Sequence, residues 1–308
     1  MSEHPENSLL RRPTGDDFVG WIGLGVMGRS MCGRLMDAGW QAVVHTRSRD
    51  KAAELLQRGA RWADSPAEVA RQAEVVFSIV GYPADVREVH LGPRGTLSTG
   101  RAGLVLVDMT PSEPALAAEI AAAASRQSAT ALDAPVSGGD VGARNGTLSI
   151  MIGGDQAAAA ALEPCWQALG SKWIWHGPAG AGQHAKLANQ TIVAGGMIGV
   201  CESLLYAHRA GLNLDRVLES VASGAAGSWA FSNLGPRIIR GDFAPGFFVD
   251  HFLKDLGIVL SEAKRMNLTL PGVELAQRLY HLAAEAGHGK SGTQSLVLAL
   301  AKLSGIEW

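Results

Sequence analysis

Short apolar runs alternate with segments of helical composition through the first half of the chain. One apolar run begins at Phe18, a helix-like segment then continues to Ala38, Gly39 stops it, and a second apolar run covers Gln41–His45. Further strand-like runs are Glu74–Val80, Gly103–Asp108, Thr130–Ala134 and Thr147–Ile152, with helical composition over Pro66–Gln72 and Glu113–Gln127. This alternation predicts a mostly parallel sheet covered by helices.

After Gly180 the pattern changes to helical periods. Gln183–Ala210 is predicted as one long helix, and breaks are expected at Pro236, Pro245 and Pro271. The domain border is placed where Gly, Pro and Ala cluster, over Gly177–Gly182. The sequence thus predicts an α/β fold with a disordered tail (residues 1–16), a Rossmann-type dinucleotide-binding domain (17–179) and an all-helical domain (180–308).

Three glycines lie between the first apolar run and the helix that follows it. Gly23 is suited to a tight turn, Gly25 lets the backbone approach a pyrophosphate, and Gly28 lets the helix pack closely on the strand. This order of strand, turn and helix favours dinucleotide binding, and an ordinary turn is the alternative. The expected cofactor contacts are Gly23, Leu24, Gly25, Val26, Met27 and Gly28.

No carboxylate follows the second apolar run, where NAD-binding versions of this fold hold the ribose hydroxyls. The residues there are Thr46, Arg47, Ser48 and Arg49. A guanidinium can fork onto a 2′-phosphate and the Ser48 hydroxyl can add a hydrogen bond, so NADP is favoured over NAD. The alternative is that Arg47 and Arg49 are solvated loop charges.

Val80 ends one predicted strand and Thr110 follows another, at the sheet edge where ligands of this fold bind. We expect both residues near the cofactor, although ordinary turns also use such segments.

Composition excludes several classes of protein. The 308 residues carry a formal net charge of −2 with scattered basic residues, so no nucleic-acid partner is expected. The 3 cysteines form no CxxC or Cys/His cluster, so we expect reduced core residues and no metal site. The longest apolar run, Thr191–Val200, is about half of a bilayer span. A soluble, cytoplasmic protein without a membrane partner is expected.

Two later segments carry candidate chemistry. Ser137, Gly138 and Gly139 offer a hydroxyl and a run of backbone N–H groups, which suit a carboxylate; an ordinary loop is the alternative. In the long helix, spacings of three and four residues place Lys186, Asn189 and Gln190 on one face. Because a lysine at the start of an apolar helix is unfavourable for packing and for the helix dipole, Lys186 is expected to face a cleft. The alternative is a surface lysine whose stem covers apolar neighbours.

A third segment, Pro245–Leu256, contains Phe247, Lys254 and Asp255. By themselves the last two residues are equally typical of an exposed pair on a helix.

Together these motifs, in this order, resemble the β-hydroxyacid dehydrogenase family over nearly all of residues 18–303. The resemblance implies a dinucleotide-binding domain followed by a helical domain that completes the active site and mediates a homodimer or homotetramer. It implies Lys186 as general acid and base, a small carboxylate substrate on Ser137, Gly138 and Gly139, and orientation of substrate and lysine by Asn189 and Gln190. It also implies that Phe247 and Asp255 border the substrate and that Lys254 approaches the cofactor.

Two departures from the family pattern leave the substrate unassigned by name. Pro111 stands where many members have a second hydroxyl. Gln190 stands where 3-hydroxyisobutyrate dehydrogenases usually carry asparagine, and tartronate semialdehyde reductases carry glutamine there too. The favoured activity is NADP-dependent interconversion of a short semialdehyde or 2-oxo acid and its hydroxy acid. The alternatives are an NAD-dependent 3-hydroxyisobutyrate dehydrogenase and a non-catalytic dinucleotide-binding protein. The related imine reductases share the architecture but usually replace the lysine, so Lys186 argues against that activity.

Overall fold

A computed structural model describes residues 18–308 of the chain; the expected disordered tail over residues 1–16 lies outside the described residues. The chain divides into two compact units, Met1–Lys186 and Leu187–Trp308. The division falls inside the long helix α9 (Ala181–Arg209), which is continuous through it. Each unit is described by itself below.

The first unit is built on one nine-stranded sheet with the order β3-β2-β1-β4-β5-β6-β8-β7, and β9 pairs with β8. Strands β1 to β6 run parallel, whereas β8 is antiparallel to β6 and β7. The strands are β1 (Phe18–Ile22), β2 (Gln41–His45), β3 (Arg61–Trp62), β4 (Val75–Ser78), β5 (Val105–Asp108), β6 (Thr130–Asp133), β7 (Val136–Ser137), β8 (Leu148–Gly153) and β9 (Gly170–Gly177).

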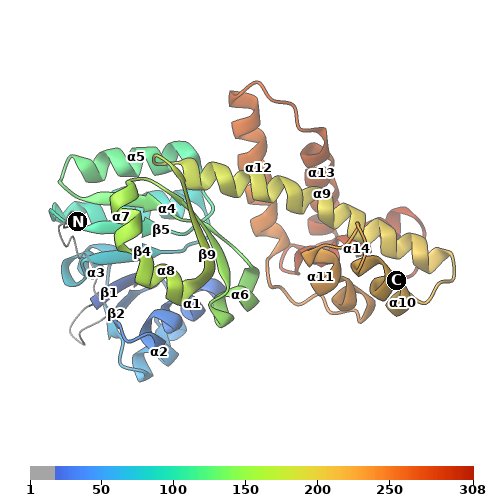
Figure 1. Ribbon diagram of the computed structural model, residues 1–308, viewed down its shortest axis with the longest axis horizontal. Coiled ribbons are helices and arrows are strands. Elements are labelled where there is room, and N and C mark those ends of the chain that lie inside the picture. The colour runs from blue at the N-terminus through green and yellow to red at the C-terminus, as the bar shows by residue number, and fades with distance from the viewer. Residues whose placement is uncertain (1–17) are drawn as a thin grey trace, which may run out of the picture. The chain divides into compact units, whose positions relative to one another are not determined.

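Helices cover both faces of this sheet (Figure 1). One layer contains α3 (Pro66–Gln72), α4 (Pro83–Leu91) and α5 (Pro114–Ser125). The other contains α1 (Val26–Asp37), α2 (Ala53–Gln57), α6 (Gly139–Asn145) and α8 (Glu163–Leu169); α7 (Gln156–Ala161) precedes α8, and η1 (Arg49–Ala52) and η2 (Thr96–Thr99) are short helical turns. Alternation along β1 explains the two cores, because Trp21 packs in the α1 layer and Ile22 in the α3 layer.

The second unit contains helices and no strand among its described residues. Its helices are the greater part of α9, then α10 (Leu214–Ala222), α11 (Trp229–Ile239), α12 (Val249–Arg265), α13 (Pro271–Ala283), η3 (Ala284–His288), η4 (Thr293–Ser295) and α14 (Leu296–Leu303). Their apolar faces form one core that includes Met197, Phe252 and Tyr280. The predicted fold class, a Rossmann-type domain followed by a helical domain, is confirmed.

Two details differ from the sequence prediction. Pro236 was expected to break a helix but lies inside α11. The helix continues because Ile238, in the turn after the proline, is fully buried, and the Arg240 N–H bonds to the Pro236 carbonyl. Such packing outweighs the roughly 3 kcal/mol by which proline disfavours a helix interior. The strands β3, β7 and β9 were also not predicted, since the first two have two residues each and β9 is largely exposed.

By length and composition alone, α9 could cross a membrane, with a mean hydropathy of 1.2 over its most apolar window. Its buried residues Ala194, Met197, Cys201 and Leu204 belong to the core of the second unit, as in the central helix of a helical domain.

Candidate active site

The glycine turn after β1 is closely packed at its first and third glycines and open at its second. Gly23 has φ +93°, and a Cβ there would lie 2.1 Å from the carbonyl oxygen of Ile79. A Cβ at Gly28 would lie 2.0 Å from the carbonyl oxygen of Gly23, whereas one at Gly25 would meet nothing within 4 Å. Only glycine therefore fits at positions 23 and 28, and Gly25 leaves open space at the start of α1.

The start of α1 fits a pyrophosphate. Gly25 is the N-cap and offers no side chain to the first backbone N–H groups, and no acidic residue lies in the first turn. The leading N–H groups of a helix have no partner within the helix, and the helix dipole favours negative charge there. Leu24 is buried and Met27 half-buried, whereas Val26 is exposed beside Gly25. These residues fit the phosphates of a dinucleotide.

Arg47 lies on the surface just beyond β2, with its side chain 84% exposed and its Nη1 3.2 Å from Oδ1 of Asp85. Asp85 belongs to the first turn of α4, where its other oxygen accepts the Tyr82 N–H at 3.2 Å. Because β1 lies between β2 and β4, this ion pair spans the end of β1, where the glycine turn begins. The neighbours of Arg47 are half-buried Thr46 and exposed Ser48.

A buried carboxylate organises the ends of β4 and β5. Oδ1 of Asp108 accepts hydrogen bonds from the Ser78 hydroxyl at 2.9 Å and from the Thr110 hydroxyl at 2.7 Å and N–H at 3.2 Å. The Thr110 hydroxyl also accepts the Val80 N–H at 2.9 Å. The structure therefore brings together two predicted cofactor residues, Val80 and Thr110, and the Thr110 hydroxyl proton is committed to Asp108.

His90 extends this network into the interior. Since Ser78 gives its proton to Asp108, its oxygen must accept from His90 Nε2–H at 3.0 Å, and Nδ1 then accepts from the Thr96 hydroxyl at 3.0 Å. Burial lowers the pKa of His90 to about 4, so the ring is neutral at pH 7. Burial raises the pKa of Asp108 to about 6, opposed by the hydrogen bonds from Thr110 and Ser78.

The first turn of α9 is bonded to the ends of β5 and β6. Asp133, 2% exposed, accepts the Gly180 N–H at 2.7 Å and the Gln183 N–H at 2.8 Å. Burial raises the pKa of Asp133, and these N–H donors act to lower it. The Gln183 side chain bonds to the backbone of Thr110 and Ser112. Lys186 follows three residues later and is 7% exposed.

The predicted carboxylate cradle starts in β7 and enters α6. Ser137 is half-buried and pairs with Ser149 of β8. Gly138 and Gly139 have φ +131° and +64°, so both occupy backbone regions that suit glycine. Successive N–H groups in such a turn can face one anion.

In the second unit, a polar chain connects α9 and α12. Nδ2 of Asn189 donates to Oε1 of Gln190 at 2.8 Å, and Nε2 of Gln190 donates to Oδ2 of Asp255 at 2.6 Å. Oδ1 of Asp255 forms an ion pair with Lys254 Nζ at 2.8 Å. The structure thus places four predicted residues together, and the Lys254–Asp255 pair is largely buried, at 11% and 1% side-chain exposure, rather than exposed.

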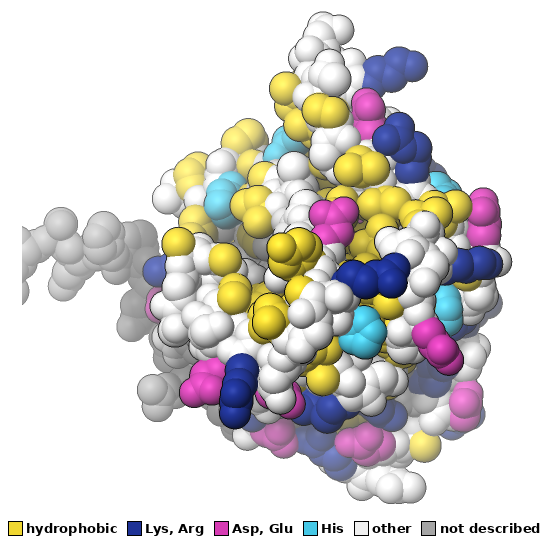
Figure 2. Space-filling view, turned by 90° about the vertical axis from the view of Figure 1, so that its right-hand side faces the viewer, with side chains coloured by type: hydrophobic (Ala, Val, Ile, Leu, Met, Phe, Trp, Pro, Cys, Tyr) yellow, Lys and Arg dark blue, Asp and Glu magenta, His cyan; other side chains and the backbone are white. Residues whose placement is uncertain are grey.

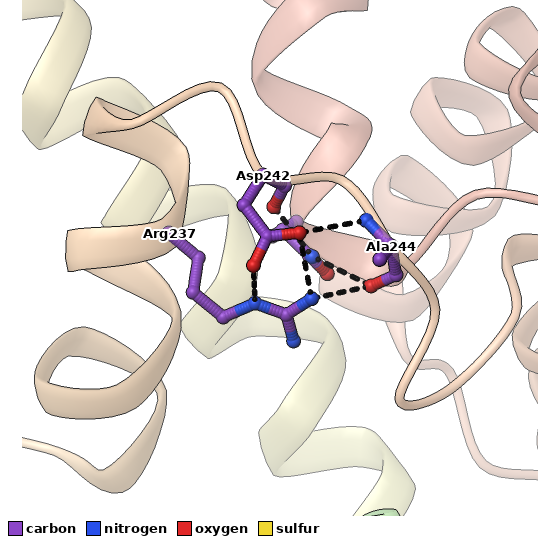
Figure 3. A network of polar contacts seen from close by, with 4 residues as sticks. Arg237, Asp242 and Ala244 are labelled. Carbon is purple, nitrogen blue, oxygen red and sulfur yellow. Dashed lines mark hydrogen bonds and ion pairs between the residues drawn. The ribbon is translucent and has the colours of Figure 1, made fainter.

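Phe247 is half-buried, with its ring edge-on to Phe252 at 5.6 Å. The loop before it is fixed by Arg237, which donates from Nε to Asp242 at 2.8 Å and from Nη2 to the Ala244 carbonyl (Figure 3). The hydrogen bond from Arg237 also lowers the pKa of Asp242. A surface hollow of about 530 Å³ in this unit, between Leu260 and Glu274, includes none of the predicted residues.

Sequence reasoning did not single out Ser78, Asp85 or His90, and it assigned no role to Asp133 or Gln183. Ser78 had one signal in the sequence, a hydroxyl at the end of a strand-like run, and the structure pairs it with Asp108 at the end of β5. Over residues 18–308, no cluster of three or more His, Cys, Asp or Glu side chains could hold a metal ion.

Comparison with known families gives two matches, one after the other along the chain. The model of the NAD binding domain of 6-phosphogluconate dehydrogenase matches residues 18–177. The model described as NAD-binding of NADP-dependent 3-hydroxyisobutyrate dehydrogenase matches residues 180–300.

Known proteins match nearly the whole chain. The Arabidopsis thaliana protein named "probable 3-hydroxyisobutyrate dehydrogenase-like 1, mitochondrial" is 54% identical over 94% of this chain and 86% of its own length. The 2-hydroxy-3-oxopropionate reductase of Escherichia coli is 37% identical over 92% of this chain and 96% of its own. A crystal structure of 3-hydroxyisobutyrate dehydrogenase from Salmonella typhimurium superposes with a TM-score of 0.84 at 32% identity, covering 92% of this chain and 99% of that one.

Proposed function

Because the chain belongs to the β-hydroxyacid dehydrogenase family, we propose that it interconverts a short semialdehyde or 2-oxo acid and the corresponding hydroxy acid, with Lys186 as general acid and base and NADP as the preferred cofactor. At the coarser level it is an NAD(P)-dependent oxidoreductase of the 3-hydroxyisobutyrate dehydrogenase and tartronate semialdehyde reductase type.

The observation that carries the proposal is the placement of Lys186. Lys186 is 7% exposed and lies in the second turn of a helix whose first turn is bonded to the sheet edge. Burial of a lysine is costly, and few lysines in folded proteins are this buried. A purely structural lysine would more often extend its ammonium to solvent.

The chemistry of an amine fits this role. When the substrate carbonyl is reduced, negative charge develops on its oxygen, and the Lys186 ammonium stabilises that charge and donates the proton. In the oxidative direction the neutral amine accepts the hydroxyl proton. The bound dinucleotide supplies or accepts the hydride. We propose that Asn189, Gln190 and Asp255 orient the reacting groups through their hydrogen-bonded chain, and that Lys254 has the role of a cofactor contact.

NADP preference is supported by charge at the end of β2. No carboxylate occupies the residues from Thr46 to Arg49, and Arg47 is 84% exposed and thus accessible to a 2′-phosphate. Asp85 competes for the same guanidinium, so its negative charge is the specific observation that favours the NAD alternative.

The substrate class follows from Ser137, Gly138 and Gly139, which are suited to a carboxylate. Phe247 is proposed as the apolar neighbour of the substrate. We propose a small carboxylate-bearing substrate. To identify it, initial rates are measured with glyoxylate, succinic semialdehyde, tartronate semialdehyde and methylmalonate semialdehyde, each with NADPH and with NADH. We expect Ser137→Ala to raise KM for these carboxylates more than for uncharged aldehydes.

The deciding experiment is single-turnover NADPH oxidation by the wild type and Lys186→Ala, with NADPH binding measured separately by fluorescence. We expect kcat to fall by roughly 10² to 10⁴-fold while NADPH affinity stays nearly unchanged. Lys186→Arg retains the charge but cannot release a proton at neutral pH, so the oxidative direction suffers most. If Lys186→Ala keeps more than about a tenth of wild-type kcat, Lys186 is not the general acid. Absence of wild-type turnover with every substrate, despite NADPH binding, supports the non-catalytic alternative.

We further propose a cytoplasmic homodimer or homotetramer. The helical unit exposes Ile192, Tyr206, Trp229 and Met266 at 52–77%, and hydrophobic side chains reach the surface at many points in Figure 2. Light scattering coupled to gel filtration measures the oligomeric state.

A further inference from the structure

We propose that Gln183 is a positioning residue: its buried amide, with the Asp133 carboxylate, fixes the first turn of α9 on the sheet edge and thereby sets the position of Lys186. The inference rests on the proposed role of Lys186 and adds residues to which sequence reasoning assigned no role.

Both ends of the Gln183 amide are used. Gln183 is fully buried; Nε2 donates to the Thr110 carbonyl at 2.8 Å, and Oε1 accepts the Ser112 N–H at 2.9 Å. The side chain thus bridges the helix start to the segment that follows β5. A buried amide is costly unless it is satisfied, and methionine forms helices equally well, so the contact rather than the helix accounts for glutamine here.

Asp133 holds the backbone of the same turn. Its two oxygens accept the Gly180 and Gln183 N–H groups at 2.7 and 2.8 Å, although it lies 47 residues before Gly180, at the end of β6. A Cβ at Gly182 would lie 2.4 Å from the Met151 carbonyl oxygen and 2.6 Å from that of Asp133. The turn is therefore pressed against the ends of β6 and β8, and a helix so bonded cannot slide or rotate without breaking buried hydrogen bonds.

This geometry defines where Lys186 stands. Residues three apart in a helix share a face, so Lys186 lies one turn beyond Gln183, about 4.5 Å along the axis. Thr110 is held on both sides, because its hydroxyl donates to Asp108 and its carbonyl accepts from Gln183. The predicted cofactor residue Thr110 and the lysine thus share one rigid anchor.

Gln183→Met has a similar side-chain volume and removes both hydrogen bonds. In Gln183→Glu, burial favours the protonated carboxyl, which can still accept the Ser112 N–H and donate to the Thr110 carbonyl. The control is Trp166→Phe, which removes another fully buried hydrogen bond of this unit, from Nε1 to the Ala159 carbonyl at 2.8 Å. For each variant, kcat, KM, NADPH affinity and melting temperature are measured, together with those of Lys186→Ala.

We expect kcat to fall by about 10 to 100-fold in Gln183→Met and by less in Gln183→Glu, because a small misplacement of a reacting group has this effect. The NADPH affinity of the Gln183 variants should change less than about threefold. Trp166→Phe should have a lower melting temperature than the wild type but an unchanged kcat. A kcat of Gln183→Met within threefold of the wild-type value overturns the inference. If Gln183→Met does not fold, the kcat of Gln183→Glu is used for the same decision. An active Lys186→Ala instead overturns the proposed function, whatever the result at Gln183.

Discussion

Two polar regions at the carboxyl ends of the strands are built in opposite ways. Arg47, after β2, is 84% exposed and has one partner, Asp85. The network at the ends of β4 and β5 contains Ser78, His90, Asp108 and Thr110. These residues are 0–7% exposed, and each has at least one buried hydrogen-bond partner. An exposed cation exchanges one partner for another at little cost, whereas a buried group leaves its neighbour unsatisfied. The exposed region can therefore select a ligand, and the buried one holds the framework that places it.

The largest expected effect is at the exposed region. In Arg47→Asp, a 2′-phosphate loses its charge partner and meets a like charge, so we expect NADP binding to weaken by about 3 kcal/mol, roughly 150-fold, with little change for NAD. The measurement is the dissociation constant of each cofactor and kcat/KM for both. An unchanged ratio removes Arg47 from the cofactor site, and a large loss of melting temperature breaks the contrast between the regions.

The second effect is a pH dependence within the buried region. The pKa of His90 is about 4 in the folded protein against 6.5 ordinarily, so unfolding is favoured as pH falls from 6.5 to 4. The pKa of Asp108 is about 6 against 3.8, so the folded carboxyl binds a proton below pH 6 that the unfolded one does not, which stabilises the fold on acidification. The two contributions oppose each other.

Asp108→Asn removes the Asp108 contribution and leaves that of His90. Between pH 6.5 and 4, we expect its unfolding free energy to fall by about 3 kcal/mol more than that of the wild type. Urea unfolding at pH 7, 6, 5 and 4 measures this difference. Parallel curves for the two proteins contradict the assigned opposition.

The third effect is at Asp133. Asp133→Asn keeps one oxygen but turns an amide N–H toward one of its two backbone donors, so we expect a loss of about 2 kcal/mol in unfolding free energy. Asp155→Asn is the matched control, because Asp155 is an exposed N-cap of α7, where asparagine serves equally well. Equal, small losses in both variants show that the buried carboxylate has no special role.

The smallest effect sharpens the comparison. Asp85→Asn frees Arg47 from its ion pair, so NADP should bind about threefold more tightly while NAD affinity stays constant. Titrations at low and high salt test the cause, because screening should shrink the difference. Weaker NADP binding means that Asp85 orients Arg47 instead of competing for it.

Local signals were enough for much of the fold. The helix α3 was predicted with its observed bounds, since the strand-like run from Glu74 follows it directly and Pro66 opens it; the Ser65 hydroxyl caps it in the structure. The strand β9 escaped prediction because its central residues, from Ser171 to His176, are largely exposed and show no alternation.

The candidate site divides in the same way. The glycine turn was recognisable because Gly23, Gly25 and Gly28 lie close together in sequence, and the turn conformation is local. The hydrogen bond of Gln183 to Thr110, 73 residues away, could not be predicted, because it depends on how β5 and β6 pair. Burial of His90 likewise follows from packing between α4 and η2 rather than from its own segment.

The attachment of the α9 start to the sheet also decides where relatives can exchange parts. By sequence, residues 180–186 open the helical region, yet through Asp133 and Gln183 they complete the sheet-bearing unit. A chimera joined after Lys186 inherits carboxylate, amide and helix start from one parent. A chimera joined before Gly180 takes the carboxylate from one parent and the amide and helix start from the other, so it should fold only where both parents carry compatible residues. The recombination point tolerated by this fold therefore lies inside a continuous helix.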